Sequence, residues 1–234
     1  MTTSAALDGL YPHMAGPASG RADRSGQLDT ALREALLAKC RDSVEVKSRF
    51  FDTHADELLR AAHLLAGSYR SGGRLYTMGN GGSSCDAAHI AVEFQHPVTA
   101  GRPALPAQNL AQDMAMISAV GNDVGFGEVF ARQMPGLIRP GDVALGISTS
   151  GNSANVLRGL EVAHTLGART LALAGGNGGA MAQAGFIDLC LTVGSDSIHR
   201  VQETHVAVYH VLWDLVHSLL ANDRLVQGQA RGPA

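Results

Sequence analysis

Apolar residues recur at helical spacing from Leu28 to a Ser71-Gly72-Gly73 sequence. This spacing predicts two helices, with a break near Asp52-Thr53. Apolar helices that lie outside a sheet pack either on their own domain or against another subunit, and the pattern leaves both open. The apolar positions are Leu32, Leu36, Val44, Phe51, Leu58, Leu59 and Leu65.

After Gly73, short apolar runs alternate with helix-like segments. The runs LYTMG, PAQNLA, DVALGIST, TLALAGG and LCLTVG are bounded by Gly, Pro, Asp or Ser, as is typical of strands buried on both faces. Helices are predicted over 83–95, 112–120, 126–134, 152–166 and 178–185. The alternation predicts an α/β fold with a doubly wound, mostly parallel five-stranded sheet preceded by N-terminal helices. Ligands of such sheets bind beyond the carboxyl ends of the strands.

The ends of the chain differ from its middle. Residues 1–27 are rich in Gly, Ser, Ala and Pro and lack apolar periodicity, so we predict a disordered N-terminal extension. Residues 28–222 are predicted to form a single domain, and 223–234 a flexible tail. A length of 234 residues suits one substantial core.

Composition favours a small soluble ligand. The formal charge of -3 provides no basic surface for nucleic acid, so no nucleic-acid partner is expected. The cysteines Cys40, Cys85 and Cys190 are far apart and odd in number, which suits a reducing compartment. The sequence shows neither a signal peptide nor a long uninterrupted apolar run, so we expect a cytoplasmic protein without a membrane partner.

The loop Gly79-Asn80-Gly81-Gly82-Ser83-Ser84 lies between a predicted strand and a predicted helix. Glycines let backbone N–H groups approach an anion, and a helix N-terminus adds partial positive charge. The loop therefore suits a phosphate. A tight turn with Ser83 as N-cap explains it equally well. It matches neither GxxxxGK[ST] nor GxGxxG.

A second loop, Ser148-Thr149-Ser150-Gly151-Asn152-Ser153, follows the DVALGI run. Its four hydroxyl side chains exceed what capping one helix requires, and together they can surround phosphate oxygens. Because both loops lack Lys and Arg, a phosphosugar fits better than a nucleoside triphosphate. The glycine-rich segment 175–185 is predicted only to turn the chain.

Two further segments carry residues suited to chemistry. His89 and Glu93 are spaced i, i+4 and share one helix face, where they could bind a metal, act on a substrate or form a surface pair. A long C-terminal helix carries Gln202 and three histidines. On that helix, His205 and His217 are predicted to face solvent.

Four motifs together resemble one family. The segments GNGGSSCDAAH with Glu93, VGND, GISTSGNSANV and RVQETH with His210 occur in the order typical of phosphoheptose isomerases, which are sugar-isomerase (SIS) domain enzymes. The resemblance covers Phe50 to Leu220. It implies a flavodoxin-like SIS fold, a homotetramer with active sites at subunit interfaces, and conversion of sedoheptulose 7-phosphate to D-glycero-D-manno-heptose 7-phosphate for nucleotide-activated heptose synthesis.

The resemblance also implies roles for residues. Glu93 matches the base and His210 the acid of the proton transfer, and one zinc ion per subunit is implied at His89, Glu93, Gln202 and His210. Gln202 and His210 are eight residues apart, about 12 Å along a helix, so either the helix start is distorted or different subunits contribute. The implied substrate contacts are Asn80, Gly81, Gly82, Ser83, Glu93, Asn122, Asp123, Ser148, Thr149, Ser150, Ser153 and Gln202.

One departure from the family concerns substrate preference. Many members continue after the glutamate with Leu-Thr-Gly-Arg, whereas this chain reads Phe94-Gln95-His96-Pro97, and Pro97 should end the helix. Arg102 or His96 could replace the missing arginine. Three alternatives stay open: a non-catalytic SIS protein that binds phosphosugars or associates with a replication initiator, an isomerase of another ketose phosphate, and a purely structural scaffold.

Overall fold

The computed structural model describes the backbone of residues 21–230 and the side chains of residues 28–222. Contacts within the chain separate Met1–Asp42 from Ser43–Ala234. Helix α2 (Arg21–Arg70) begins inside the segment predicted as disordered, and the last helix, α8 (Ile198–Ala230), continues past the predicted boundary at 222. Helices propagate readily from a formed segment, so an apolar stripe does not mark their ends. Residues 1–20 and 231–234 lie outside the described residues, and the domain limits stay a prediction.

The break predicted near Asp52-Thr53 corresponds to a kink in α2. His54 has non-helical backbone angles, φ -119° and ψ 18°. The three cysteines are free, in agreement with their spacing. Within the described residues, no helix combines the length and apolar character that crossing a membrane requires.

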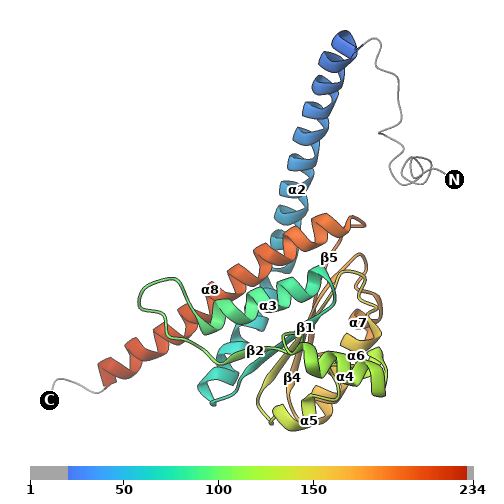
Figure 1. Ribbon diagram of the computed structural model, residues 1–234. Coiled ribbons are helices and arrows are strands. Elements are labelled where there is room, and N and C mark those ends of the chain that lie inside the picture. The colour runs from blue at the N-terminus through green and yellow to red at the C-terminus, as the bar shows by residue number, and fades with distance from the viewer. Residues whose placement is uncertain (1–20, 231–234) are drawn as a thin grey trace. The chain divides into compact units, whose positions relative to one another are not determined.

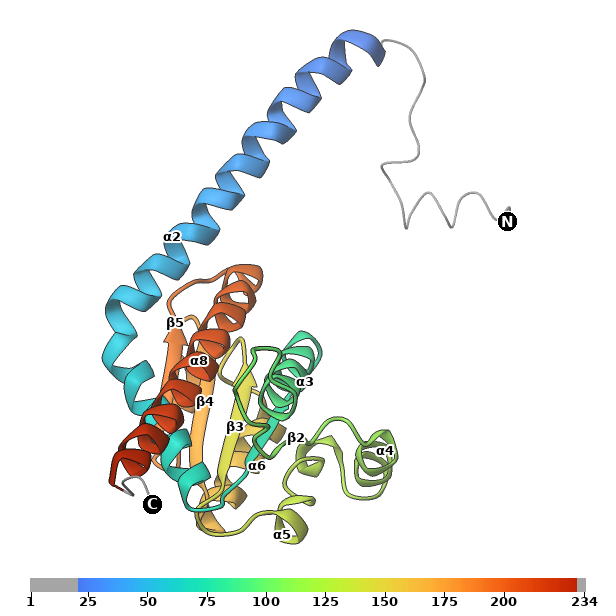
Figure 2. The same ribbon diagram turned by 90° about the vertical axis from the view of Figure 1, so that its left-hand side faces the viewer.

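Five parallel strands form one sheet in the order β2-β1-β3-β4-β5 (Figures 1 and 2). This confirms the predicted fold class and all five predicted strands. Every residue of β1 and β3 is buried, as expected for strands covered on both faces. The strands are β1 (Leu75–Gly79), β2 (Ala107–Asn109), β3 (Val143–Ser148), β4 (Arg169–Gly175) and β5 (Leu189–Val193).

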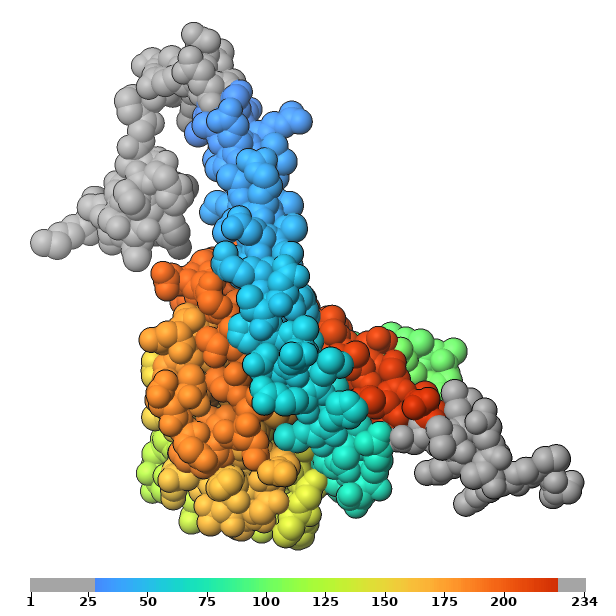
Figure 3. Space-filling view, turned by 180° about the vertical axis from the view of Figure 1, so that it is seen from behind, coloured from blue at the N-terminus to red at the C-terminus, as the bar shows by residue number. Residues whose placement is uncertain are grey.

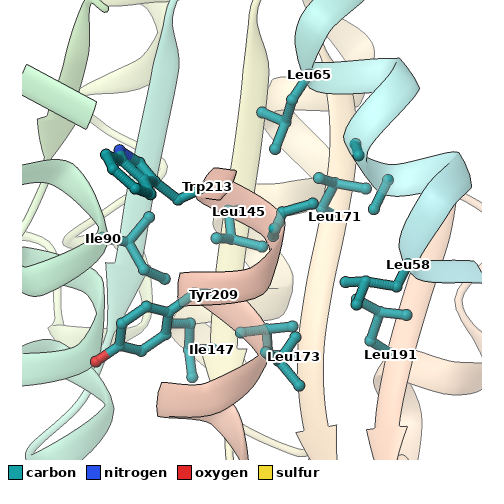
Figure 4. Packing of buried hydrophobic residues seen from close by; sticks show 14 of the residues in the cluster. Leu58, Leu65, Ile90, Leu145, Ile147, Leu171, Leu173, Leu191, Tyr209 and Trp213 are labelled. Carbon is teal, nitrogen blue, oxygen red and sulfur yellow. The ribbon is translucent and has the colours of Figure 1, made fainter. Parts of the chain in front are cut away.

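Helices cover both faces of the sheet. The part of α2 after Ser43, α3 (Gly82–Gln95) and α8 pack on one face, and Figure 3 shows that part of α2 beside α8. Alternate strand residues point to this side, where Leu58 lies near Leu191 (Figure 4). The opposite face is covered by α4 (Met114–Asp123), α5 (Met134–Leu137), α6 (Ala154–Thr165) and α7 (Gly179–Gln183).

The helix predicted over 126–134 is wrong. The chain forms a short 3-10 helix at Phe126–Glu128, then turns, and then the single-turn helix α5. The backbone N–H groups of Val129, Gln133 and Met134 bond to carbonyls three residues earlier, as in 3-10 turns, and Nε2 of Gln133 donates to the Val129 carbonyl at 2.8 Å. Apolar spacing predicted a helix, but this hydrogen bonding interrupts it.

The prediction that His205 and His217 face solvent is also wrong. Both are buried, at 0% and 2% exposure. Nε2 of His205 lies 3.1 Å from the Ala174 carbonyl oxygen, and His217 packs between Phe94 and Trp213. Because α8 contacts the sheet, α3 and α2, positions that look polar on an isolated helix become interior.

Candidate active site

The two predicted ligand loops lie at the same edge of the sheet. They follow β1 and β3, which are hydrogen-bonded neighbours with Gly79 opposite Ile147. In the order β2-β1-β3-β4-β5, the chain reverses its direction of travel across the sheet between these two strands, and this switch point is where flavodoxin-like sheets bind ligands. Helices α3 and α6 begin directly after the loops, so two helix N-termini face this position.

The first loop ends at a glycine cap and not at a serine cap. Gly81 is the N-cap of α3 with φ 55°, and Ser83 lies inside the first turn at 5% exposure. The alternative in which Ser83 caps the helix is therefore wrong. At Gly82, an added Cβ would lie 2.1 Å from Nε2 of Gln202, so this loop also packs against the start of α8.

The second loop gathers three serine hydroxyls. Oγ of Ser148 lies 2.9 Å from Oγ of Ser153 and 3.4 Å from Oγ of Ser150. Ser153 occupies the N-cap position of α6, yet its side chain makes no capping hydrogen bond. Its hydroxyl is thus oriented toward the other serines and away from the helix backbone. Thr149 is half-buried beside them.

An amide pair joins the two loops. Nδ2 of Asn80 donates to Oδ1 of Asn155 at 2.8 Å, and Nδ2 of Asn155 donates back to Oδ1 of Asn80 at 2.9 Å. Asn155 is buried in the first turn of α6. The pair sets the spacing between the two loops. Asn155 was not among the predicted site residues.

The third glycine loop does more than turn the chain, contrary to prediction. The Met181 N–H donates to the Gly151 carbonyl at 3.0 Å, and the Ala180 N–H donates to Oδ1 of Asn152 at 2.9 Å. A Cβ on Gly151 would lie 2.0 Å from the Gly178 oxygen. The third loop therefore packs backbone to backbone against the serine loop and supports its shape.

His89, Glu93 and His210 converge between α3 and α8. One ligand atom from each lies within 4.8 Å of the other two. Nε2 of His89 is 3.2 Å from Oε1 of Glu93, and the His89 and His210 rings are 5.0 Å apart. All three side chains are partly exposed. Two imidazoles and a carboxylate form a donor set that zinc and related divalent ions bind.

Two buried groups border this cluster and were not predicted. Oη of Tyr209 lies 2.7 Å from Nδ1 of His89. Burial raises the pKa of Asp86 to about 6, although nearby His89 opposes the shift. Burial also raises the pKa of Tyr209, and the carboxylates of Asp86 and Glu93 add to that rise. In the sequence, Tyr209 resembles an ordinary core residue of α8, so no pattern separated it from its apolar neighbours.

Comparisons with known proteins point to one family. Residues 40–175, more than half of the chain, match the SIS domain family. The phosphoheptose isomerase of Aquifex aeolicus is 43% identical over 77% of this chain and 93% of its own length. The chain belongs to the phosphoheptose isomerase family. The family member from Chlorobaculum tepidum is 41% identical over 83% of this chain and 93% of its own length.

A solved structure of the family supports the fold as well. The phosphoheptose isomerase of Neisseria gonorrhoeae matches with a TM-score of 0.74 at 35% identity, covering 80% of this chain and 99% of that protein. The likeness therefore extends over most of the chain.

Three of the residues matched to the phosphoheptose isomerase site lie away from the cluster. Gln202 packs against Gly82, and because α8 starts at Ile198, Gln202 lies within the helix and not at a distorted start. Asn122 and Asp123 are exposed at the end of α4, where the Asn122 amide donates to the Asp123 carboxylate at 2.8 Å.

The structure also shows where Arg102 and His96 lie, the two residues that could replace the arginine missing after Glu93. Helix α3 ends at Gln95 with His96 as C-cap, so the predicted early end before Pro97 is confirmed. Arg102 pairs with Asp214, and its guanidinium lies 4.3 Å from the centre of the Trp213 ring. The indole N–H of Trp213 donates to the Glu93 carbonyl at 2.9 Å. Arg102 is thereby connected to the turn that carries Glu93, whereas His96 is exposed.

Proposed function

We propose that this protein is an aldose–ketose isomerase that converts sedoheptulose 7-phosphate to D-glycero-D-manno-heptose 7-phosphate, a step toward nucleotide-activated heptose. The observation that carries the proposal is the pairing of a His/Glu/His cluster with two phosphate-type loops in a phosphoheptose isomerase family chain. Gly82 and His89 are separated by about 10 Å along α3, a distance that an extended sugar phosphate spans. The phosphate would lie at the loops and the reacting carbons at the cluster.

The proposed chemistry moves one proton between adjacent carbons. The Glu93 carboxylate takes a proton from C1 of the ketose, the C1–C2 enediol forms, and the proton is delivered to C2 while the carbonyl moves to C1. His210 exchanges protons with the two sugar oxygens. Asn122 and Asp123 are proposed sugar contacts, and Ser148, Thr149, Ser150 and Ser153 are proposed phosphate contacts.

Zinc is the proposed metal. His89, Glu93 and His210 fit it by donor type and mutual distance. A bound zinc ion supplies Lewis-acid polarisation of a carbonyl oxygen. A carboxylate has two oxygens, so Glu93 can hold a metal with one and accept a proton with the other.

A homotetramer is proposed as the active assembly, with Gln202 of a neighbouring subunit as the fourth zinc ligand. About 12 Å of helix separates Gln202 from His210 in one chain, which favours a ligand from another copy. In the first unit of the chain, Leu28, Leu32 and Leu36 are spaced by one helical turn and are all more than half exposed. This apolar stripe suits packing against another copy.

The test is incubation of the purified protein with sedoheptulose 7-phosphate, with and without added zinc, followed by NMR detection of the aldose phosphate. Turnover is expected in the wild type. Glu93→Gln should lose at least about 100-fold in kcat yet still bind the sugar phosphate. The control Glu161→Gln removes an exposed carboxylate paired with Arg158 and should leave turnover unchanged. If the wild type gives no turnover while the ligand raises its Tm, the non-catalytic or other-ketose alternative replaces this proposal.

A further inference from the structure

Tyr209 contacts both histidines of the cluster. Its hydroxyl oxygen lies 2.7 Å from Nδ1 of His89, and its ring packs edge-on against His89 at 5.2 Å and tilted against His210 at 4.8 Å. The side chain is only 2% exposed. Its ring sits among Ile90 and Ile147, with the hydroxyl at the border of the apolar cluster (Figure 4). Packing therefore fixes where this hydroxyl lies.

The state of Nε2, the other ring nitrogen of His89, decides whether the Tyr209 hydroxyl donates to Nδ1 or accepts from it. Nε2 is 3.2 Å from Oε1 of Glu93, and an ionised carboxylate only accepts hydrogen bonds. A neutral His89 that donates from Nε2 to Glu93 has an unprotonated Nδ1, so Tyr209 must donate. When Nε2 instead presents its lone pair to a metal, the proton sits on Nδ1 and Tyr209 must accept.

We propose that Tyr209 is a positioning residue that keeps His89 oriented in both states, because a hydroxyl can donate to Nδ1 in one and accept from it in the other. During the change, the imidazole loses the proton on Nε2 and gains one on Nδ1, so it stays neutral. The hydroxyl keeps its own proton and rotates about its C–O bond. A backbone carbonyl or a carboxylate could serve only the metal-bound state. The inference rests on the metal site in the proposed function.

The metal affinity tests the inference. Tyr209→Phe keeps the ring and removes the hydroxyl. Zinc affinity, measured by competition with a chromophoric chelator, should fall about 10- to 100-fold, as is usual when a histidine ligand loses the hydrogen bond at its other ring nitrogen. The matched control is Tyr76→Phe. Tyr76 is also buried, and its hydroxyl donates to the Leu137 carbonyl on the other face of the sheet. That variant should bind zinc like the wild type. Zinc affinity of Tyr209→Phe within twofold of wild type overturns the inference.

The histidine tautomer provides a second readout that needs no turnover. NMR of isotope-labelled histidine, recorded with and without zinc, reports which ring nitrogen of His89 carries the proton. His89 should carry its proton on Nε2 without metal and on Nδ1 with zinc. If Nδ1 carries the proton both with and without zinc, the proposed change of tautomer is overturned. A wild type that binds no zinc overturns the metal site and this inference together, and the sugar phosphate assay then judges isomerase activity separately.

Discussion

Asn80 and Asn155 exchange two hydrogen bonds, 2.8 and 2.9 Å long, between the loop after β1 and the first turn of α6. The two loops come from segments that lie far apart in the chain. Their alignment at the switch point therefore depends on a pair of side chains as well as on the neighbouring strands.

Replacing Asn155 with Ala should weaken sugar phosphate binding more than it slows turnover. Asn80 loses both partners, so the loops are no longer held in register, and KM should rise roughly tenfold with a smaller change in kcat. Steady-state kinetics provide the measurement. Asn109→Ala is the control, because it removes another buried strand-end amide, which accepts from the Ala111 N–H. Equal KM values for the two variants would contradict a role for the pair.

Ser153 tests whether the serine loop binds ligand or merely caps a helix. Because its hydroxyl makes no capping bond, Ser153→Ala loses only the bond to Ser148, so the unfolding free energy should fall by at most about 1 kcal/mol while KM rises. The comparison is Asp113→Ala. Asp113 caps α4 by accepting from the Met116 N–H at 3.0 Å, so its loss should cost about 1 kcal/mol. Denaturant titration and kinetics measure both, and a destabilised Ser153→Ala with normal KM would favour the capping role.

A substitution at Gly151 tests whether the third glycine loop, residues 175–185, supports the serine loop. Gly151→Ala places a Cβ 2.0 Å from the Gly178 backbone oxygen at φ 66°, so strain and collision should together cost roughly 2–4 kcal/mol. Gly176→Ala has nearly the same φ, 62°, but nothing lies within 4 Å. Its cost should be about 1 kcal/mol, from backbone strain alone. If chemical denaturation shows the same loss of unfolding free energy for Gly151→Ala and Gly176→Ala, the contact between the two loops contributes little to stability.

His205 makes stability depend on pH. Burial lowers its pKa from 6.5 to about 4, against the opposing effect of its bond to Ala174. Between these values only the unfolded chain takes up the proton, so the stabilisation is complete above pH 6.5 and is lost as the pH falls toward 4, by about 3 kcal/mol. Asp86 acts in the opposite direction, because its raised pKa means that the folded state binds a proton below about pH 6.

The variant His205→Gln isolates the contribution of His205 to this pH dependence. It removes the imidazole but keeps a side-chain hydrogen-bond donor, and Asp86 is unchanged. The difference in unfolding free energy between wild type and variant should shrink or reverse from pH 7.5 to pH 5, as followed by urea denaturation. A difference that is constant with pH would mean that His205 does not titrate in this range.

Local chemistry was enough to predict the sheet and the positions of the two loops after β1 and β3. Five apolar runs became five parallel strands, because short buried strands between helices carry a distinct pattern. The i, i+4 spacing of His89 and Glu93 alone placed them on one face of α3. The helix predicted over 126–134 failed because apolar spacing does not show hydrogen bonding, and there Gln133 donates to the Val129 carbonyl with its side chain and to the Phe130 carbonyl with its backbone N–H.

The sequence by itself determined the fold class, the family and the residue types available for chemistry, since strand and helix patterns and adjacent motifs are local properties. Only the tertiary structure decided which groups meet. It placed Tyr209 against both His89 and His210, paired Asn80 with Asn155, and buried His205 and His217. The contacts of Tyr209, His205 and His217 depend on how α8 packs against α3 and the sheet, and the Asn80–Asn155 pair depends on how the loop after β1 lies beside α6. Such packing joins residues that are far apart in the chain, which no periodicity along the chain encodes.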